Sequence, residues 1–245
     1  MTTTQARPRI IVENVTKEFR KRATRSFKDT FIALVTRKET KGARFRALED
    51  ISFMIGEGES VAVMGLNGSG KSTTLKLVSG VLEPDAGTVL TRGRVAGLIE
   101  VGAGFHPDLT GRENVFLNAA ILGMSEKETK EQFDEIVAFS EIGEFIDQEV
   151  KHYSSGMFMR LAFSVAIHVK LDVLLVDEVL AVGDAPFRAK CAVKLREMAD
   201  SGVTMMVVSH SKSQVKELCT RGIILRKGRM VFDGPIDEAL DLLDD

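Results

Sequence analysis

The sequence has few cysteines and no long apolar run. Its 245 residues include only two cysteines, Cys191 and Cys219, each in a stretch with helical periodicity and neither spaced like a metal ligand. We expect two reduced, buried thiols, because disulfides and zinc sites need paired or clustered cysteines. The longest apolar runs, such as 173–176, fall far short of the roughly 20 residues that a transmembrane helix needs. These shortages argue against a disulfide, a zinc site and a membrane-spanning chain.

Targeting, repeat and linker signals are also missing. Residues 1–8 contain no apolar segment that could serve as a secretion signal, and a strand-like segment follows them directly. No repeat and no Pro-, Ser- or Gln-rich linker divides the chain. Because 44% of the residues are hydrophobic, the chain can bury a sizeable core. We therefore expect one domain over residues 1–245 that stays in the cytoplasm.

The net charge of −2 hides one strongly basic segment. Residues 20–46 contain ten Lys or Arg against two carboxylates, a charge of +8, so the remainder carries −10. An acidic remainder argues against a protein that coats nucleic acid. Within the segment, residues 27–35 have apolar side chains at helical spacing, with Ser26 as an N-cap. Two interpretations remain open: a solvated surface loop, or an amphipathic basic helix at a membrane interface or against a partner.

Strand and helix signals follow one another in an order typical of α/β proteins. Short β-branched runs predict strands at 10–12, 51–55 and 60–64. Apolar residues at three- and four-residue spacing then predict helices over 113–122, 126–139 and 156–169. Later segments predict strands at 173–176 and 204–208, helices at 186–200 and 211–219, a hairpin of 223–225 with 230–232, and a short helix from Pro235. This order predicts a parallel sheet with an inserted helical subdomain.

A glycine-rich segment follows the predicted strand 60–64. Gly65-Leu-Asn-Gly-Ser-Gly-Lys71-Ser72 matches the P-loop pattern and directly precedes a predicted helix. Glycines let backbone N–H groups converge on phosphate oxygens, and an ordinary glycine-rich turn would not need Lys and Ser at this offset. We expect Lys71 to reach the β- and γ-phosphates and Ser72 to ligate Mg²⁺. The predicted nucleotide-binding residues here are Gly65, Asn67, Gly68, Ser69, Gly70, Lys71, Ser72 and Thr73.

Two carboxylates end the apolar strand Val173-Leu-Leu-Val-Asp177-Glu178. A buried strand does not need them for its own stability. Asp177 is placed to hold Mg²⁺, and Glu178 to polarise a water for in-line attack on the γ-phosphate. One acidic pair is a weak signal, but together with a P-loop it predicts an ATPase that uses ATP and Mg²⁺.

The segment Tyr153-Ser-Ser-Gly-Met157 begins an apolar helix. It resembles the signature motif of ABC ATPases, usually Leu-Ser-Gly-Gly-Gln, although a plain serine N-cap is the alternative interpretation. The resemblance implies an α/β fold with a RecA-like core, an antiparallel β subdomain and an inserted α-helical subdomain over about residues 100–169. It also implies that Ser154, Ser155 and Gly156 bind the γ-phosphate of ATP held by the other copy in a head-to-tail homodimer.

Smaller elements of the same family occur in the same order. Ala181-Val-Gly-Asp184 resembles the D-loop, which contacts the opposite protomer, and His210 resembles the switch histidine that helps to orient the attacking water. Glu100 is the candidate for the place where relatives carry a Mg²⁺-ligating glutamine. Two aromatic residues are candidates for stacking on adenine: Phe19, which ends the first strand and is preferred, and Phe45, which precedes the next strand after a long insertion.

The basic segment and residues 100–114, 153–157 and 178–184 together resemble ATPases that export O-antigen, teichoic acid, capsule or galactan chains. This resemblance implies a peripheral subunit on the cytoplasmic face of the inner membrane, an ABC-2-type integral membrane subunit, an undecaprenyl-linked glycan as cargo, and no nucleic-acid partner. No carbohydrate-binding domain is expected after the hairpin. The alternative is an exporter of a lipid, drug or other small substrate. An ABC ATPase acting on DNA or ribosomes would carry two P-loops or a long coiled-coil insertion, and this sequence has neither.

Overall fold

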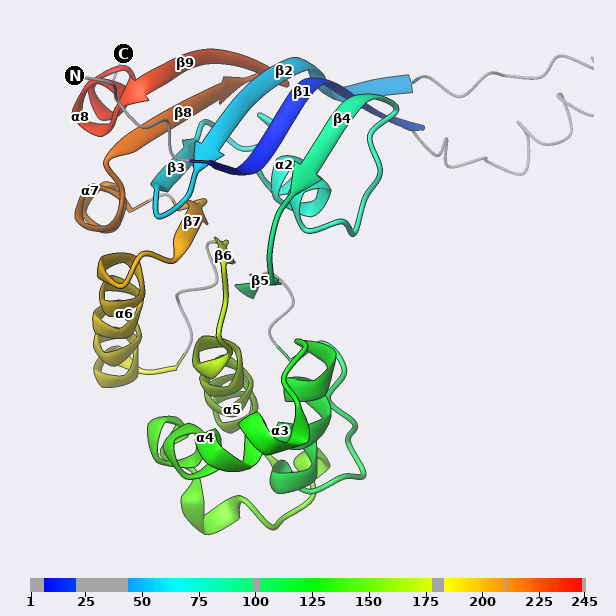
Figure 1. Cartoon of the computed structure of the whole chain (residues 1–245), viewed down its shortest axis with the longest axis vertical. Helices are drawn as coiled ribbons and strands as arrows, with labels where there is room; N and C mark the ends of the chain where they lie inside the picture. Colours follow the sequence, from blue (N-terminus) through cyan, green and yellow to red (C-terminus); the bar gives the residue numbers. More distant parts are fainter. Residues whose placement is uncertain (1–6, 21–43, 99–101, 178–182, 210, 244–245) are drawn as a thin grey trace, which may run out of the picture.

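Two β-sheets and a group of helices make up the protein (Figure 1). The computed structural model describes residues 7–20, 44–98, 102–177, 183–209 and 211–243. Residues 21–43 of the basic segment, which include its predicted helix 27–35, lie outside the described residues. Glu100, Glu178 and His210 also lie outside them.

The first sheet is antiparallel and has the strand order β2-β1-β4. Its strands are β1 (Pro8–Arg20), β2 (Arg44–Gly56) and β4 (Ala86–Thr91). The first strand is much longer than the predicted run 10–12, because residues 16–20 are partly buried or exposed and four of the five are polar, so they carry little apolar signal. The antiparallel subdomain expected from the family resemblance is confirmed.

The second sheet has the order β5-β6-β7-β3-β8-β9, and neighbouring strands are parallel except for the final β8–β9 hairpin. Its strands are β3 (Ser60–Met64), β5 (Val95–Gly97), β6 (Val173–Val176), β7 (Thr204–Val207), β8 (Arg221–Arg226) and β9 (Arg229–Pro235). Every residue of β3, β6 and β7 is buried, as expected for parallel strands covered on both faces. The predicted parallel sheet is confirmed.

Alternate residues of the parallel strands enter two different hydrophobic cores. Val61 and Val63 of β3 pack with the antiparallel sheet and helix α2 (Lys71–Val78). Ala62 and Met64 face the opposite core, which helices α5 (Ser155–His168), α6 (Ala185–Asp200), α7 (Lys212–Leu218) and α8 (Ile236–Asp241) cover. The sheet is therefore the middle layer of the molecule.

Helices α3 (Gly111–Ile121) and α4 (Glu126–Ser140) pack with α5 in a third core, beside the sheets in Figure 1. Both helices begin with a capping box, Thr110 with Glu113 and Ser125 with Glu128, which satisfies the free N–H groups of the first turn. Helix α5 belongs to two cores, since Val165 packs in the third core and Phe163 packs against the sheet. Short 3₁₀ helices at Gly143–Phe145 and Val150–His152 connect α4 to α5.

The structure bears on two expectations drawn from missing features. Cys191 and Cys219 are free and buried, as predicted, and burial raises the pKa of each thiol to about 12. In the part of the chain that the structure describes, no helix combines the length and the apolar character that crossing a membrane requires.

Arg221 of β8 joins four segments of the two sheets. Its guanidinium contacts both carboxylate oxygens of Asp233 in β9 at 2.6 and 2.7 Å, Glu59 at 2.9 Å and the carbonyl oxygen of Met54 in β2 at 3.0 Å. Three quarters of the side chain is shielded from solvent, since 26% is exposed. A fork with two parallel bonds is a geometry that arginine provides and lysine does not.

We therefore expect Arg221→Lys to lower the free energy of unfolding by about 1.5 to 3 kcal/mol, because it leaves charged acceptors without donors. Urea denaturation monitored by circular dichroism measures this loss. The matched control is Arg229→Lys, which removes a similar arginine contact with Glu49 where 66% of the arginine is exposed. Exposed pairs contribute little, so equal losses for the two variants would contradict the role given to Arg221.

Candidate functional site

The glycine-rich loop connects β3 to α2 and has an unusual backbone. Gly65, Gly68 and Gly70 have φ values of +143°, +77° and +113°, a region that side chains rarely adopt. Gly70 is also the N-cap of α2, and Lys71 is the first helical residue. The loop therefore ends at the positive end of a helix dipole, as a phosphate site requires.

Neighbouring strands leave no room for side chains on two of these glycines. A Cβ on Gly65 would collide with the carbonyl oxygen of Leu225 in β8, and one on Gly70 would lie 2.9 Å from the carbonyl oxygen of Ala47 in β2. The turn between β8 and β9 supports the loop as well, because the Gly228 N–H donates to the Ser69 carbonyl at 2.9 Å. The loop shape is thus determined by β2 and β8 together.

Lys71 is buried, with 6% of its surface exposed. Its ammonium donates to the carbonyl oxygens of Gly65 at 2.8 Å and Leu66 at 3.3 Å. The Ser69 hydroxyl oxygen is also buried, and among the described residues no hydrogen-bond partner reaches it. Buried polar groups in proteins are nearly always paired, so the unpaired Ser69 hydroxyl is an exception among the described residues.

Beside the loop lies an open cavity of about 300 Å³. Asp177, which directly follows β6, meets the loop here, as the sequence predicted, although about one hundred residues separate the two motifs. The lining residues are Asn67, Gly68, Gly70, Lys71, Ser72, Thr73 and Asp177. Two ligands predicted for Mg²⁺, Ser72 and Asp177, are therefore in one cavity.

The residues present fit a magnesium ion bound with a phosphate. Mg²⁺ prefers hydroxyl and carboxylate oxygens, and it usually takes one or two protein ligands together with water and substrate phosphates. Ser72 and Asp177 supply such a pair. Over the described ranges no group of three or more His, Cys, Asp or Glu gathers at any point.

Strand β7 lies between β6 and β3, which brings the ends of three parallel strands together. Val208, just after β7, donates its N–H to the Val176 carbonyl at 2.7 Å. The catalytic residues predicted from sequence, Glu178 and His210, follow the ends of β6 and β7 but lie outside the described residues, so their roles stay predictions. The same holds for Glu100 as a metal ligand.

The signature segment forms the N-terminus of α5. Ser154 is the N-cap, and its hydroxyl accepts the Met157 N–H at 3.1 Å. Ser154 and Ser155 are exposed. A Cβ added to Gly156 would meet nothing nearer than the Ser154 oxygen at 3.8 Å. The chain itself therefore does not require glycine at position 156.

A separate cavity of about 670 Å³ borders this segment. It is lined by Ser154, Ser155 and Gly156, by Ile142 and Phe145 from the α4–α5 connection, and by Gly183 and Asp184 before α6. None of the residues that line the P-loop cavity lines this one. Within one chain, the structure does not bring the signature residues and the P-loop residues into one cavity.

An ion-pair network that the sequence did not indicate lies beside the signature segment. Arg160, in the second turn of α5, contacts Asp184 at 2.7 Å and Glu141 at 3.0 Å. Glu141 also contacts Lys190 of α6 at 3.0 Å. The Phe187 N–H and then Arg160 hold the pKa of Asp184 below its usual range. The sequence signal that could have indicated this network was Arg160 itself, a charged residue among the apolar residues of 158–166.

The two candidate aromatic residues lie directly opposite each other on paired strands. Phe19 of β1 and Phe45 of β2 are register partners, and 39% and 47% of their surfaces are exposed. Directly opposed residues of an antiparallel pair share one face of the sheet. The structure therefore brings Phe19 and Phe45 together, and the preference for Phe19 stays a prediction.

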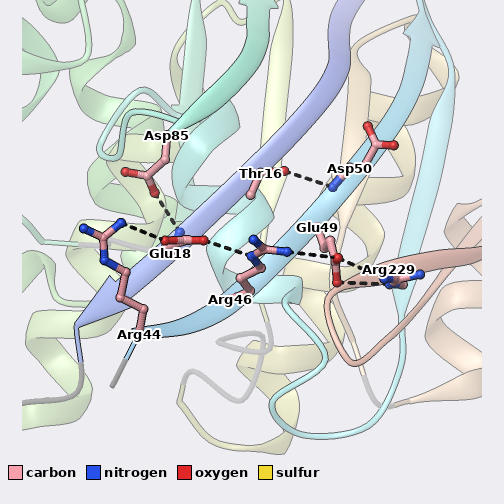
Figure 2. A network of polar contacts seen from close by, with 8 residues as sticks. All are labelled: Thr16, Glu18, Arg44, Arg46, Glu49, Asp50, Asp85 and Arg229. Atoms are coloured by element: carbon pink, nitrogen blue, oxygen red, sulfur yellow. Dashed lines mark hydrogen bonds and ion pairs between the residues drawn. The ribbon is translucent and has the colours of Figure 1, made fainter. Parts of the chain in front are cut away.

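A row of charged residues connects the neighbouring strands near these positions (Figure 2). Glu18 contacts Arg46 at 2.9 Å and Arg44 at 3.3 Å, and these arginines lower the pKa of its carboxyl. Arg46 also contacts Glu49, which in turn pairs with Arg229. The row of alternating charges links β1, β2 and β9. Arg20 and Arg44 are register partners, so the last described residue of β1 and the first of β2 lie side by side.

Comparison with known proteins identifies the family. A family model described as ABC transporter matches residues 48–181, which is more than half of the chain. The chain belongs to the ABC transporter family. The O-antigen export system ATP-binding protein RfbB of Klebsiella pneumoniae is 50% identical to this ABC chain over 202 residues, which are 82% of each sequence. The family resemblance inferred from the motifs is confirmed.

Other relatives of this ABC chain are longer. The teichoic acids export ATP-binding protein TagH of Bacillus anthracis is 41% identical over 235 residues, which cover 95% of this chain and 42% of the relative. A solved dimeric structure of the ATP-binding cassette MJ0796, bound to ADP and Pi, has a TM-score of 0.72 at 23% identity, with 93% of this chain and 98% of that chain covered. The structural likeness confirms the predicted ABC-type fold.

The buried contacts of Lys71 predict a large effect on nucleotide binding. We expect Lys71→Ala to weaken binding of a fluorescent ATP analogue about 10- to 100-fold, since a charge-assisted hydrogen bond to phosphate is lost. Lys76→Ala, five residues further along α2 and exposed, is the matched control and should bind like the wild type. An unchanged dissociation constant for Lys71→Ala would show that the loop is not the nucleotide site.

Proposed function

We propose that this chain is the ATP-hydrolysing subunit of an ABC exporter for a lipid-linked polysaccharide. The observation that carries the ATPase part is the cavity shared by Lys71, Ser72 and Asp177. A lysine, a hydroxyl and a carboxylate beside backbone N–H groups at a helix N-terminus are the groups that a nucleoside triphosphate with Mg²⁺ needs. Few other ligands would use all four.

In the proposed mechanism, the glycine-rich loop and Lys71 hold the phosphates, and Ser72 and Asp177 ligate Mg²⁺. Bound Mg²⁺ neutralises phosphate charge and orients the phosphates for in-line attack. Glu178 accepts the proton of the attacking water, and His210 helps to position that water. Phe19, beside Phe45, stacks on the adenine ring.

We propose that two copies complete each site together. Ser154, Ser155 and Gly156 border a cavity that the P-loop of the same chain does not share. The exposed serines and the helix N-terminus present N–H and O–H donors to an incoming anion. A head-to-tail homodimer places the signature segment of one protomer over the ATP of the other. The dimeric cassette of similar fold supports this arrangement.

The cargo is proposed from the relatives. Proteins named for O-antigen export and for teichoic acid export are 50% and 41% identical to this chain. We accordingly propose an undecaprenyl-linked glycan as the cargo, an ABC-2-type membrane subunit as the partner, and the cytoplasmic face of the inner membrane as the location. The basic segment at 20–46 would then lie near anionic headgroups.

Mixing two inactive variants tests the shared site. Lys71→Ala and Ser154→Arg each inactivate one part, and in a mixed head-to-tail dimer one of the two composite sites retains both intact parts. We expect the mixture to regain ATP hydrolysis that neither variant shows alone, measured as phosphate release. Ser125→Arg, which removes the N-cap of α4 instead, should keep its own activity. No recovery on mixing would contradict a site shared between copies.

Depleting the chain in its host tests the cargo. If it powers glycan export, lipid-linked polysaccharide should accumulate inside the cell, and mass spectrometry of extracted lipids would identify it. The chain should also co-purify with a membrane protein encoded beside it. Normal surface glycan after depletion, with no lipid-linked intermediate, would refute the export proposal and leave the ATPase proposal standing.

A further inference from the structure

Tyr153, the residue before Ser154, connects two segments that line the cavity of about 670 Å³ beside the N-terminus of α5. We call this cavity the signature cavity. The Tyr153 hydroxyl donates to the carbonyl oxygen of Phe145 at 2.8 Å. Phe145 and Ser154, the next residue after Tyr153, both line that cavity. The tyrosine is partly buried, and burial raises its pKa to about 12, so the hydroxyl keeps its proton for this bond. A leucine, usual at this place in the signature motif, could not make it.

The tyrosine ring packs against the first residue of α3. A Cβ added to Gly111 would collide with the Tyr153 hydroxyl and would lie 3.0 Å from the Ile146 carbonyl oxygen. Unlike the glycines of the P-loop, Gly111 does not have a positive φ. Its lack of a side chain is therefore explained by the close approach of Tyr153 and not by backbone conformation.

Backbone hydrogen bonds join the surrounding segments into one unit. The N–H groups of Gly111 and Arg112 donate to the carbonyl oxygens of Gln148 at 3.0 Å and Ile146 at 2.8 Å. In the opposite direction, the Val150 N–H donates to Leu109 at 2.9 Å. Residues 146–150 are thus hydrogen-bonded to residues 109–112 at the start of α3. Tyr153 follows this paired stretch and contacts Gly111.

The start of α3 is itself held firmly. Asn114 is fully buried, its Oδ1 accepts the His106 N–H at 2.7 Å, and the two hydrogens of its Nδ2 are shared among the nearby carbonyl oxygens of His106, Leu109 and Thr110. Asn118, one turn later, donates to Ala103 at 2.8 Å. A buried network with every member paired is rigid, so Tyr153 packs against a rigid start of α3.

We infer that Tyr153 is a positioning residue: through Gly111 and Phe145 it fixes the place at which Ser154 and the α5 N-terminus meet the nucleotide. The inference rests on the proposed shared ATP site. Misplacing a group by about 1 Å is enough to slow a reaction up to about 100-fold. Tyr153 lines neither the P-loop cavity nor the signature cavity. It therefore affects hydrolysis only by fixing the position of Ser154.

The test compares Gly111→Ala, Tyr153→Phe and the double variant. Gly111→Ala should lower kcat about 10- to 100-fold by displacing the tyrosine, and Tyr153→Phe only about 2- to 10-fold by losing one hydrogen bond. In the double variant the colliding oxygen is gone, so its kcat should exceed that of Gly111→Ala alone. Nucleotide affinity, measured by equilibrium binding under non-hydrolysing conditions, should stay within about twofold of wild type in all three.

Gly143→Ala is the matched control. It lies in the same group of helices, has no positive φ, and its added Cβ would meet only Val137 at the ordinary contact distance of 3.8 Å; its kcat should be unchanged. An unchanged kcat for Gly111→Ala, or a double variant no faster than Gly111→Ala, would overturn the inference. A wild-type chain that neither binds nor hydrolyses ATP would instead refute the proposed function, so the two failures are distinguishable.

Discussion

The parallel hydrogen bonding of β6, β7 and β3 determines where the polar residues of the candidate site can lie. Parallel strands end at the same edge of a sheet, and the Val208–Val176 bond keeps these ends level. Asp177 therefore meets the P-loop although it is far away in sequence. The two hydrophobic cores on either side of the sheet fix this edge, because every residue of the three strands is buried. The placement of Asp177 beside the P-loop is a consequence of core packing.

A second constraint acts on the loop itself. Carbonyl groups from β2 and β8 fill the space behind Gly70 and Gly65, and the Gly228 N–H supports Ser69 from the β8–β9 turn. Segments at both ends of the sequence thus shape one phosphate loop. Such preorganisation matters for phosphoryl transfer, since the protein contributes mainly positioning and charge stabilisation.

Local patterns predicted the fold, and they placed the P-loop and Asp177 each at the end of a strand. The spacing of Gly65 to Ser72 and the strand before Asp177 are signals within one segment, and each fixes its residue types for a physical reason. Strands β4 and β5 were not predicted, because one is mostly exposed and the other has three residues. Contacts between distant segments were also missed: nothing near Arg160 in sequence indicates Asp184 or Glu141. Likewise, no local pattern indicates that Phe19 and Phe45 are register partners on adjacent strands.

The open space around Gly156 has a consequence for how a substitution at this position would affect a cell that also makes the normal protein. Since the chain leaves room for a side chain there, a substitution would escape the proteases and chaperones that remove misfolded proteins. In the proposed homodimer, such a subunit would still pair with normal copies and occupy their sites. A cell carrying both versions would lose more transport than half. Errors at this position would therefore behave as dominant, whereas errors in the buried strands would remove only the faulty copy.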